Sequence, residues 1–210
     1  MFMSRVRILA ALIAAASAAA PLHAQEVEPA AETQNDAIAT ATDFATSLMA
    51  GATAALTDEN ATEEERLERF RVVLGDGLAL ETIGKFMLGE SRKSMTDAQT
   101  ARYNAIFPRY ITNLYAEQFD EIIGKPLEVI DAKAIGARDV IVRTQFERTD
   151  ASPIMVDWRI RKLRSGEHKA IDIIVSGVSI MLVKREEFSA FIATNGIDAL
   201  LDRLELETAD

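Results

Sequence analysis

The stretch from Ala170 to Phe188, AIDIIVSGVSIMLVKREEF, decides how we interpret the fold. Its alternating isoleucine and valine residues predict a buried strand that breaks at Ser176-Gly177. Apolar residues resume over 178–182, which we interpret as more strand, and a charged helix start follows at 184–187. A strand that turns into a helix at a Gly-Val-Ser sequence brings a sheet and a set of helices together at one edge.

Four stretches show the period-two alternation of β-strands, and short turns separate them. Such turns predict an antiparallel meander with one wet face. Within the third stretch, Val156, Trp158 and Ile160 share the face that we expect to be buried, and Asp157 falls on the wet face. The predicted strands cover residues 127–135, 139–148, 154–163 and 168–176.

Helical spacing of apolar residues dominates the chain before residue 126 and returns after the last strand. Two capping boxes, Thr62-x-x-Glu65 and Thr96-x-x-Gln99, mark helix starts. Pro108 lies within the longest helical pattern, where we expect a kink or a break because proline removes one hydrogen bond. The pattern predicts an α+β fold in which N-terminal helices pack on a twisted antiparallel four-stranded meander and C-terminal helices follow. Helices are expected at about 36–56, 62–74, 78–88, 96–123, 185–194 and 197–204.

The N-terminus predicts export. Arg5 and Arg7 precede an apolar run of about a dozen residues, which suits a secretory signal and is too short to span a bilayer. We place its cleavage after Ala24, so residues 1–24 are the signal peptide. Residues 25–35 are polar and lack periodicity, which predicts a disordered lead-in, and residues 36–210 are expected to form a single domain.

The charge and the residue types limit the possible functions. The formal net charge is −10, and loss of two arginines with the signal peptide makes it −12. This acidity argues against nucleic acid, whose binding depends on cationic contacts to phosphate, and against passive attachment to an anionic membrane. The chain has no cysteine, and His168 is the one histidine after residue 24, so no His/Cys zinc site can form. We expect His168 to be solvated beside a turn.

We predict neither a metal nor a cofactor. The acids at 63–65 fit the dipole of a helix start better than a metal site. The sequence also has no Gly-rich phosphate loop. What remains is an excess of apolar surface on the sheet and on the long helix. The plain interpretation is a packed core, and the sharper one is a pocket that holds the sheet and helices apart. The expected lining residues are Val140, Val142, Phe146, Val156, Trp158, Ile160, Val175 and Val178, with Phe107, Tyr110 and Leu114 from the long helix.

A C-terminal motif carries a resemblance to a known family. Ile174 to Ser179, followed by Arg185, Phe188 and Gly196, resembles the C-terminal signature of the MlaC family, also called toluene-tolerance auxiliary proteins. The helical half is similar as well, at Leu88-Gly89 and then at Gln99, Phe107, Leu114 and Tyr115. The resemblance covers the chain from about residue 36 to its end. It departs from the family at His168, where a Trp is usual, and after Gly89, where Glu90-Ser91-Arg92 replaces the usual aromatic residue.

The resemblance implies a soluble periplasmic carrier that is not an enzyme. Such a protein takes a phospholipid by its acyl chains into an apolar pocket between sheet and helices. It moves lipid between an outer-membrane lipoprotein complex and an inner-membrane MCE-domain ABC transporter, and so maintains outer-membrane lipid asymmetry. We expect exposed basic residues near the strand ends to dock these partners, namely Arg159, Arg161, Lys162 and Arg164.

Two other classes of function stay open at this point. A small α+β hydrolase or isomerase acting on an apolar substrate would need a polar dyad in the pocket, for which Asp172 with Tyr103 or Tyr110 is the available pairing. We expect Asp172 to lie on the wet face of its strand, opposite Ile171. A structural or adaptor domain would instead have a filled core and no ligand.

Overall fold

The computed structural model describes residues 29–119, 127–148 and 152–209, and it has the predicted α+β architecture. Four α-helices and a 3₁₀ helix come first, a five-stranded sheet follows, and two helices end the chain. The first group is α1 (Pro29–Leu56), α2 (Glu63–Gly77), α3 (Leu80–Leu88), η1 (Gly89–Ser94) and α4 (Asp97–Phe119). The second is β1 (Leu127–Ile135), β2 (Asp139–Phe146), β3 (Ile154–Lys162), β4 (His168–Val175), β5 (Val178–Ser179), α5 (Ile180–Asn195) and α6 (Ile197–Thr208).

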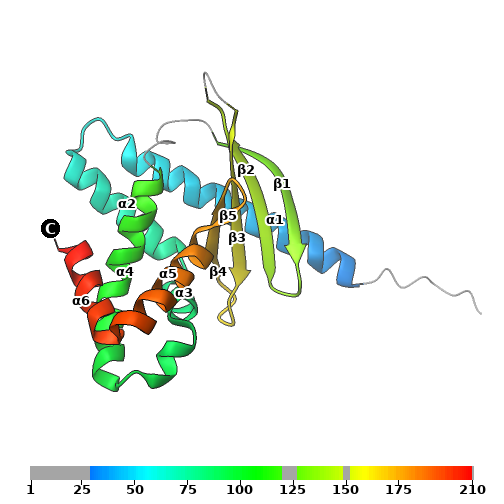
Figure 1. Cartoon of the computed structure of the whole chain (residues 1–210). Helices are drawn as coiled ribbons and strands as arrows, with labels where there is room; N and C mark the ends of the chain where they lie inside the picture. The colour runs from blue at the N-terminus through cyan, green and yellow to red at the C-terminus, as the bar shows by residue number, and fades with distance from the viewer. Residues whose placement is uncertain (1–28, 120–126, 149–151, 210) are drawn as a thin grey trace, which may run out of the picture.

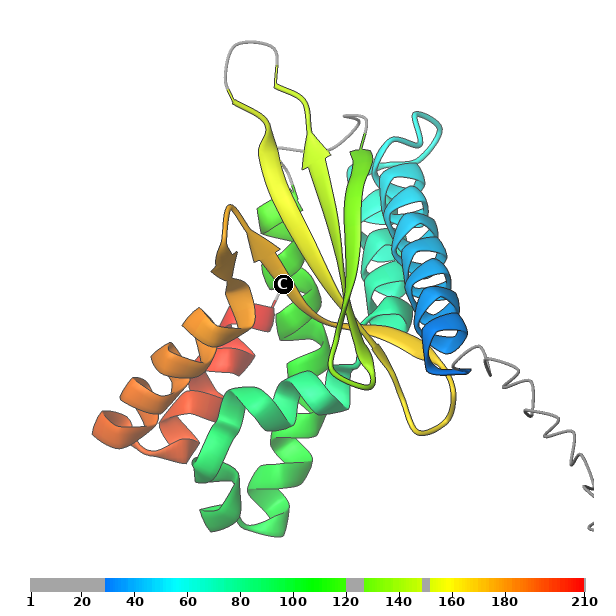
Figure 2. The same cartoon turned by 90° about the vertical axis from the view of Figure 1, so that its right-hand side faces the viewer.

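The sheet lies at one side of the molecule and most helices lie at the other (Figure 1). The long helix α1 joins the two parts, because it contacts β1, β2, β3 and β4 as well as α2. Seen from the side, α1 and α2 stand together on one flank of the sheet, and α5 and α6 lie on the opposite flank (Figure 2). This arrangement puts the apolar face of the sheet under α1.

The sheet is an antiparallel meander in the order β1-β2-β3-β4-β5. Its buried face follows the predicted alternation, since Val142 pairs with Trp158, and Trp158 with Ile173. The Trp158 side chain is fully buried and donates its Nε1–H to Thr144 Oγ1, 3.1 Å away. The Thr144 hydroxyl in turn donates to the Val156 carbonyl at 2.8 Å. Each polar atom of this buried pair thus has a partner, which the low dielectric of a core demands.

The stretch after β4 differs from its prediction. Ser176 and Gly177 form the expected break, a two-residue turn in which both have positive φ, and Val178–Ser179 returns as a fifth strand. The strand interpretation of 180–182 is wrong, because α5 already begins at Ile180. Ser179 caps this helix by accepting a hydrogen bond from Leu182 N at 3.0 Å. A helix cap therefore ends the strand sooner than the apolar run suggested.

The capping boxes and the long helix form as predicted. Thr62 and Glu65 make both reciprocal hydrogen bonds, and Thr96 and Gln99 do the same at the start of α4. Helix α4 runs through Pro108 without a break, so the alternative of two separate helices is wrong. Proline removes one backbone donor, and contacts with α2, α3 and α6 surround the helix that contains it.

The N-terminal boundary also differs from its prediction. Helix α1 begins at Pro29, so residues 29–35 of the expected disordered lead-in belong to the helix. Proline suits a first helical turn, and the alanines and glutamate that follow have high helix propensity. Apolar periodicity, which guided the prediction, starts only further along. The signal peptide and residues 25–28 lie outside the described residues.

Candidate ligand-binding site

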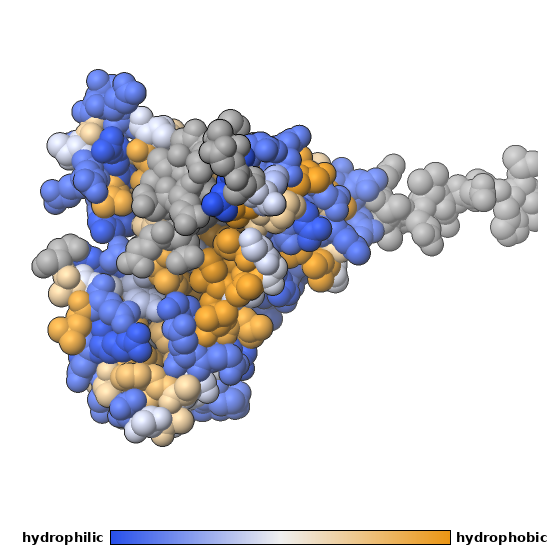
Figure 3. Space-filling view, turned by 45° about the horizontal axis from the view of Figure 1, so that its top comes forward, coloured by the Kyte–Doolittle hydropathy of each residue, from blue (hydrophilic) through white to orange (hydrophobic). Residues whose placement is uncertain are grey.

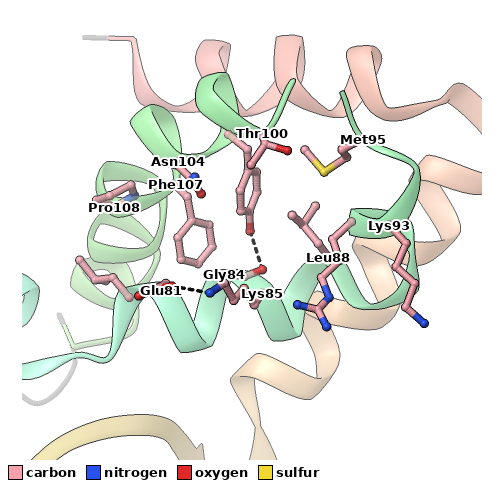
Figure 4. A pocket seen from close by; sticks show the side chains of 13 residues that line it. Glu81, Gly84, Lys85, Leu88, Lys93, Met95, Thr100, Asn104, Phe107 and Pro108 are labelled. Atoms are coloured by element: carbon pink, nitrogen blue, oxygen red, sulfur yellow. Dashed lines mark hydrogen bonds and ion pairs between the residues drawn. The ribbon is translucent and has the colours of Figure 1, made fainter. Parts of the chain in front are cut away.

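A cavity of about 680 Å³ lies between α3, η1 and α4 (Figure 4). Buried apolar side chains form its floor, among them Leu88, Tyr103 and Phe107. Exposed polar and charged groups form its rim, with Lys85 and Lys93 on the α3 and η1 side. The volume falls within the range of small-molecule pockets, about 300–1,000 Å³. A buried apolar floor beside a charged rim suits an amphiphilic ligand.

The floor exists because α3 and α4 approach each other at Gly84. A Cβ at this position would lie 3.1 Å from Phe107 Cδ1 and 3.3 Å from Tyr103 Cε1, closer than side chains normally pack. The Tyr103 hydroxyl donates to the Gly84 carbonyl at 3.2 Å, and burial raises the pKa of this phenol well above its usual range. Glycine therefore lets the two rings of α4 lie directly on the backbone of α3.

A row of aromatic side chains on α4 continues from this floor into the core. Tyr103 stacks on Phe107 with ring centroids 5.1 Å apart, and Phe107 tilts against Tyr110 at 6.4 Å. Tyr110 contacts Phe188 of α5 at 5.7 Å. Helical spacing thus places these aromatic side chains of α4 in one row, which leads from the cavity floor to the core.

The structure places the expected lining residues at several different depths. Phe107 lines the cavity. Most of the sheet residues, together with Tyr110, lie in the packed core, and Leu114 and Val175 are partly buried against it. Val178 is 55% exposed, because it stands on the short edge strand β5. The residues in the core are Val140, Val142, Phe146, Val156, Trp158 and Ile160.

We expected a pocket between the sheet and the helices. The larger of the two described cavities lies elsewhere. The surface still shows hydrophobic residues gathered between the sheet and the helical half (Figure 3). A second cavity of about 430 Å³ lies between α1 and the β1–β2 turn. Its lining includes Asp139, Val140 and Lys162 and is more polar than that of the first cavity.

Two of the four expected docking residues are not free cations. Arg159 Nη2 and Arg161 Nε each lie 2.6 Å from a carboxylate oxygen of Asp139, which is buried. Burial opposes ionisation of Asp139, but the hydrogen bonds from Arg161 and Arg159 outweigh it and lower the pKa of this carboxyl. Lys162 and Arg164 are exposed, as predicted. Both arginines remain partly exposed, but the strand register brings both beside Asp139, so that each pairs with this carboxylate.

Asp172 is buried, contrary to its prediction as a wet residue. The start of α5 covers it, so that its carboxylate accepts a hydrogen bond from the Ser179 hydroxyl at 2.7 Å. Burial raises the pKa of Asp172, although the hydrogen bonds that its carboxylate accepts act in the opposite direction. The dyad of Asp172 with Tyr103 is not formed, because the Tyr103 hydroxyl is bonded to Gly84. Asp172 instead ties β4 to α5.

Sequence reasoning missed most of this cavity. Its α3 and η1 side includes Leu80, Leu88, Arg92 and Met95, for which the sequence predicted a short helix over 78–88 and no part in a pocket. The available signal was the mixture of basic and apolar residues in 88–95, between two helices. Within the described residues, no group of three potential metal ligands comes together, and no helix is long and apolar enough to cross a membrane.

Comparisons with known proteins agree with this fold. A family model described as MlaC protein matches residues 46–206. The intermembrane phospholipid transport system binding protein MlaC of Haemophilus influenzae is 25% identical over 129 residues, which are 60% of this chain and 60% of that protein. The phospholipid-binding protein from Ralstonia solanacearum, solved in complex with a phospholipid, matches with a TM-score of 0.68 and 16% identity. That match covers 80% of this chain and 96% of the solved one, and it shows a shared fold.

Proposed function

Because the chain belongs to the MlaC family, we propose that it is a periplasmic phospholipid carrier. The observation that supports this most directly is the cavity between α3, η1 and α4, with its buried apolar floor and charged rim. The names of the relatives from Haemophilus influenzae and Ralstonia solanacearum, which concern phospholipid transport and binding, point the same way. We propose binding and transfer of an intact lipid, without catalysis and without a cofactor.

The driving force is burial of acyl chains on the aromatic floor. Each methylene removed from water contributes about 0.8 kcal/mol, so two acyl chains with on the order of thirty methylenes are held strongly. A bare lipid escapes into water very slowly for the same reason. A carrier therefore has to reproduce this burial and release the lipid only in contact with a partner.

The volume indicates how a two-chain lipid is accommodated. If a methylene occupies roughly the 30 Å³ that a water molecule takes in the liquid, thirty methylenes need on the order of 900 Å³. The described cavity, about 680 Å³, suffices for one chain and part of a second. We propose that the rest comes from separation of neighbouring core residues, which puts the predicted sheet face and Tyr110 and Leu114 in contact with the second chain.

Transfer requires partners, which we infer from the family. We propose that the carrier exchanges lipid with an outer-membrane lipoprotein complex and an inner-membrane MCE-domain ABC transporter, and that this maintains outer-membrane lipid asymmetry. A net charge of −12 after loss of the signal peptide disfavours contact with anionic headgroups, so local complementarity must guide docking. Lys162 and Arg164 are the exposed candidates, with Arg159 and Arg161 held beside them by Asp139.

The experiment that tests this function is native mass spectrometry of the chain from residue 25, purified without detergent and then incubated with phospholipid vesicles. We expect about one phospholipid per chain, and organic extraction should return the protein to its apo mass. A protein that stays at the apo mass after incubation would overturn the proposal and favour an adaptor domain.

A further inference from the structure

The cations that line the cavity differ in their pairing. Lys85 pairs with Glu81 one turn earlier in α3, and Lys93 pairs with Glu90 in η1. Arg92 is exposed and lines the same cavity, and its side chain makes no ion pair or hydrogen bond with the described residues. Among the lining residues that the structure describes, Arg92 is therefore the cation whose charge remains available to a ligand.

The charge of this lining is opposite to that of the chain. The whole chain has a formal charge of −10, but the cavity is lined by three cations and a single acid, Glu81. An unpaired cation beside a buried apolar floor matches an amphiphile whose apolar chain ends in an oxyanion. The planar guanidinium of arginine donates two parallel hydrogen bonds to a phosphate, which makes arginine better suited to this group than lysine.

We propose that Arg92 binds the phosphate of the lipid whose acyl chain lies on the floor formed by Leu88, Tyr103 and Phe107. This inference rests on the proposed function and assigns the headgroup end of that site. Thr100 and Asn104 of α4 also line the cavity, and they offer a hydroxyl and an amide to the same headgroup. The site thus distinguishes a phospholipid from a neutral lipid with identical acyl chains.

The test compares two short-chain lipids with the same acyl chains, phosphatidylglycerol and diacylglycerol, on the delipidated chain from residue 25. Competition with a bound fluorescent fatty-acid analogue gives the affinity for each. The variants are Arg92→Gln and Arg92→Lys. The matched control is Arg66→Gln on α2, which removes an arginine whose side chain also makes no ion pair within the described residues. Circular dichroism and thermal unfolding check that each variant folds.

For Arg92→Gln we expect roughly tenfold weaker binding of phosphatidylglycerol, the typical effect of losing a hydrogen bond to a charged group. Binding of diacylglycerol should not change. Arg92→Lys should fall between wild type and Arg92→Gln, because lysine keeps the charge and loses the paired donors. Arg66→Gln should bind both lipids as the wild type does.

Three results would overturn the assignment. Equal affinity of wild type and Arg92→Gln for phosphatidylglycerol would show that Arg92 does not bind the headgroup, while leaving the carrier function intact. If palmitate bound as tightly as phosphatidylglycerol, the site would recognise any oxyanion and not phosphate in particular. A wild type that binds neither lipid would remove the proposed function together with this inference.

Discussion

Two buried carboxylates on the sheet show how the local environment sets a charge. Asp139 receives hydrogen bonds from Arg161 and Arg159, and its pKa is lowered although burial opposes ionisation. Asp172 is buried under the start of α5, and its pKa is raised because hydrogen bonds from Ser179 and Met181 do not offset desolvation. The same residue type therefore stabilises the fold in opposite ranges of pH.

Replacing Asp172 with asparagine should remove the cost of a buried charge. The folded protein binds the Asp172 proton more tightly than the unfolded chain does, so this carboxyl's contribution is largest at acid pH and is lost as the pH rises. We therefore expect Asp172→Asn to gain stability relative to wild type as the pH rises above about 4, the ordinary pKa of an aspartate. Urea unfolding at several pH values measures this difference. A relative stability of the variant that declines toward neutral pH would contradict the explanation.

Replacing Asp139 with asparagine should have the opposite pH dependence. The lowered pKa means that the contribution of this carboxylate is present at neutral pH and disappears as the pH falls through its folded-state pKa. At pH 7 we expect a loss of about 2 kcal/mol in the free energy of unfolding, since two arginines lose a charged acceptor.

The matched control for Asp139 is Asp157→Asn. Asp157 accepts two hydrogen bonds from a single arginine, Arg143, at 2.8 Å each. This ion pair is more exposed to solvent than the ion pairs of Asp139. We expect a loss below about 1 kcal/mol, typical of surface pairs. Equal losses for the two variants would indicate that burial of Asp139 does not matter.

Among the elements, the contact of α3 with α4 determines the candidate site. Helical periodicity predicted both helices and the aromatic stripe of α4, and the capping box of Thr96 and Gln99 located the start of α4. The cavity itself was not predictable from those patterns. It depends on how closely two backbones approach at Gly84 and on the turn of 3₁₀ helix at η1, and neither leaves a periodic signal. The burial of Asp172 was missed for a similar reason, because the helix that covers it starts sooner than expected.

Replacing Gly84 with alanine should have two opposing effects on stability, a gain from helix propensity and a loss from packing. Alanine in a helix gains up to about 1 kcal/mol over glycine, but at this position its Cβ displaces the Phe107 ring. We expect no net gain in stability and weaker lipid binding, because the ring moves into the cavity. Thermal unfolding and lipid competition measure the two effects.

Gly75→Ala provides the control on α2, where nothing lies within 4 Å of an added Cβ. This variant should show the full gain in stability and unchanged lipid binding. If Gly84→Ala gained as much stability as Gly75→Ala and bound lipid equally well, the close approach of α3 and α4 would have no role in the site.

At the scale of the whole molecule, sequence patterns located four strands, most helix boundaries and the α+β class. Alternation was reliable because the sheet has one buried face, so a slip of one residue would expose Trp158 and its neighbours. The charge of the chain was equally clear from its composition. The repulsion that we expect between this chain and an anionic membrane therefore depends on the charge of its entire surface.

We predict that lipid extraction from anionic vesicles becomes faster as salt is added. The chain and the vesicle repel each other at low ionic strength, and the screening length shrinks from about 10 Å at 0.1 M to about 3 Å at 1 M. Transfer of a fluorescent phospholipid from phosphatidylglycerol vesicles measures the rate, and phosphatidylcholine vesicles are the control with no net charge. A rate that falls with salt on the anionic vesicles would show that local attraction outweighs the net charge.

Helix α1 also constrains the order in which the chain can fold. It is synthesised before the rest of the described fold, but the strands that it covers begin only at Leu127 (Figure 1). Until β1 and β2 exist, α1 has no strand to pack against, and its contacts with β3 and β4 form later still. The apolar face of the sheet therefore closes late, after most of the chain has been made. A polypeptide organised in this way cannot bury the apolar face of its sheet until its last strands have been synthesised.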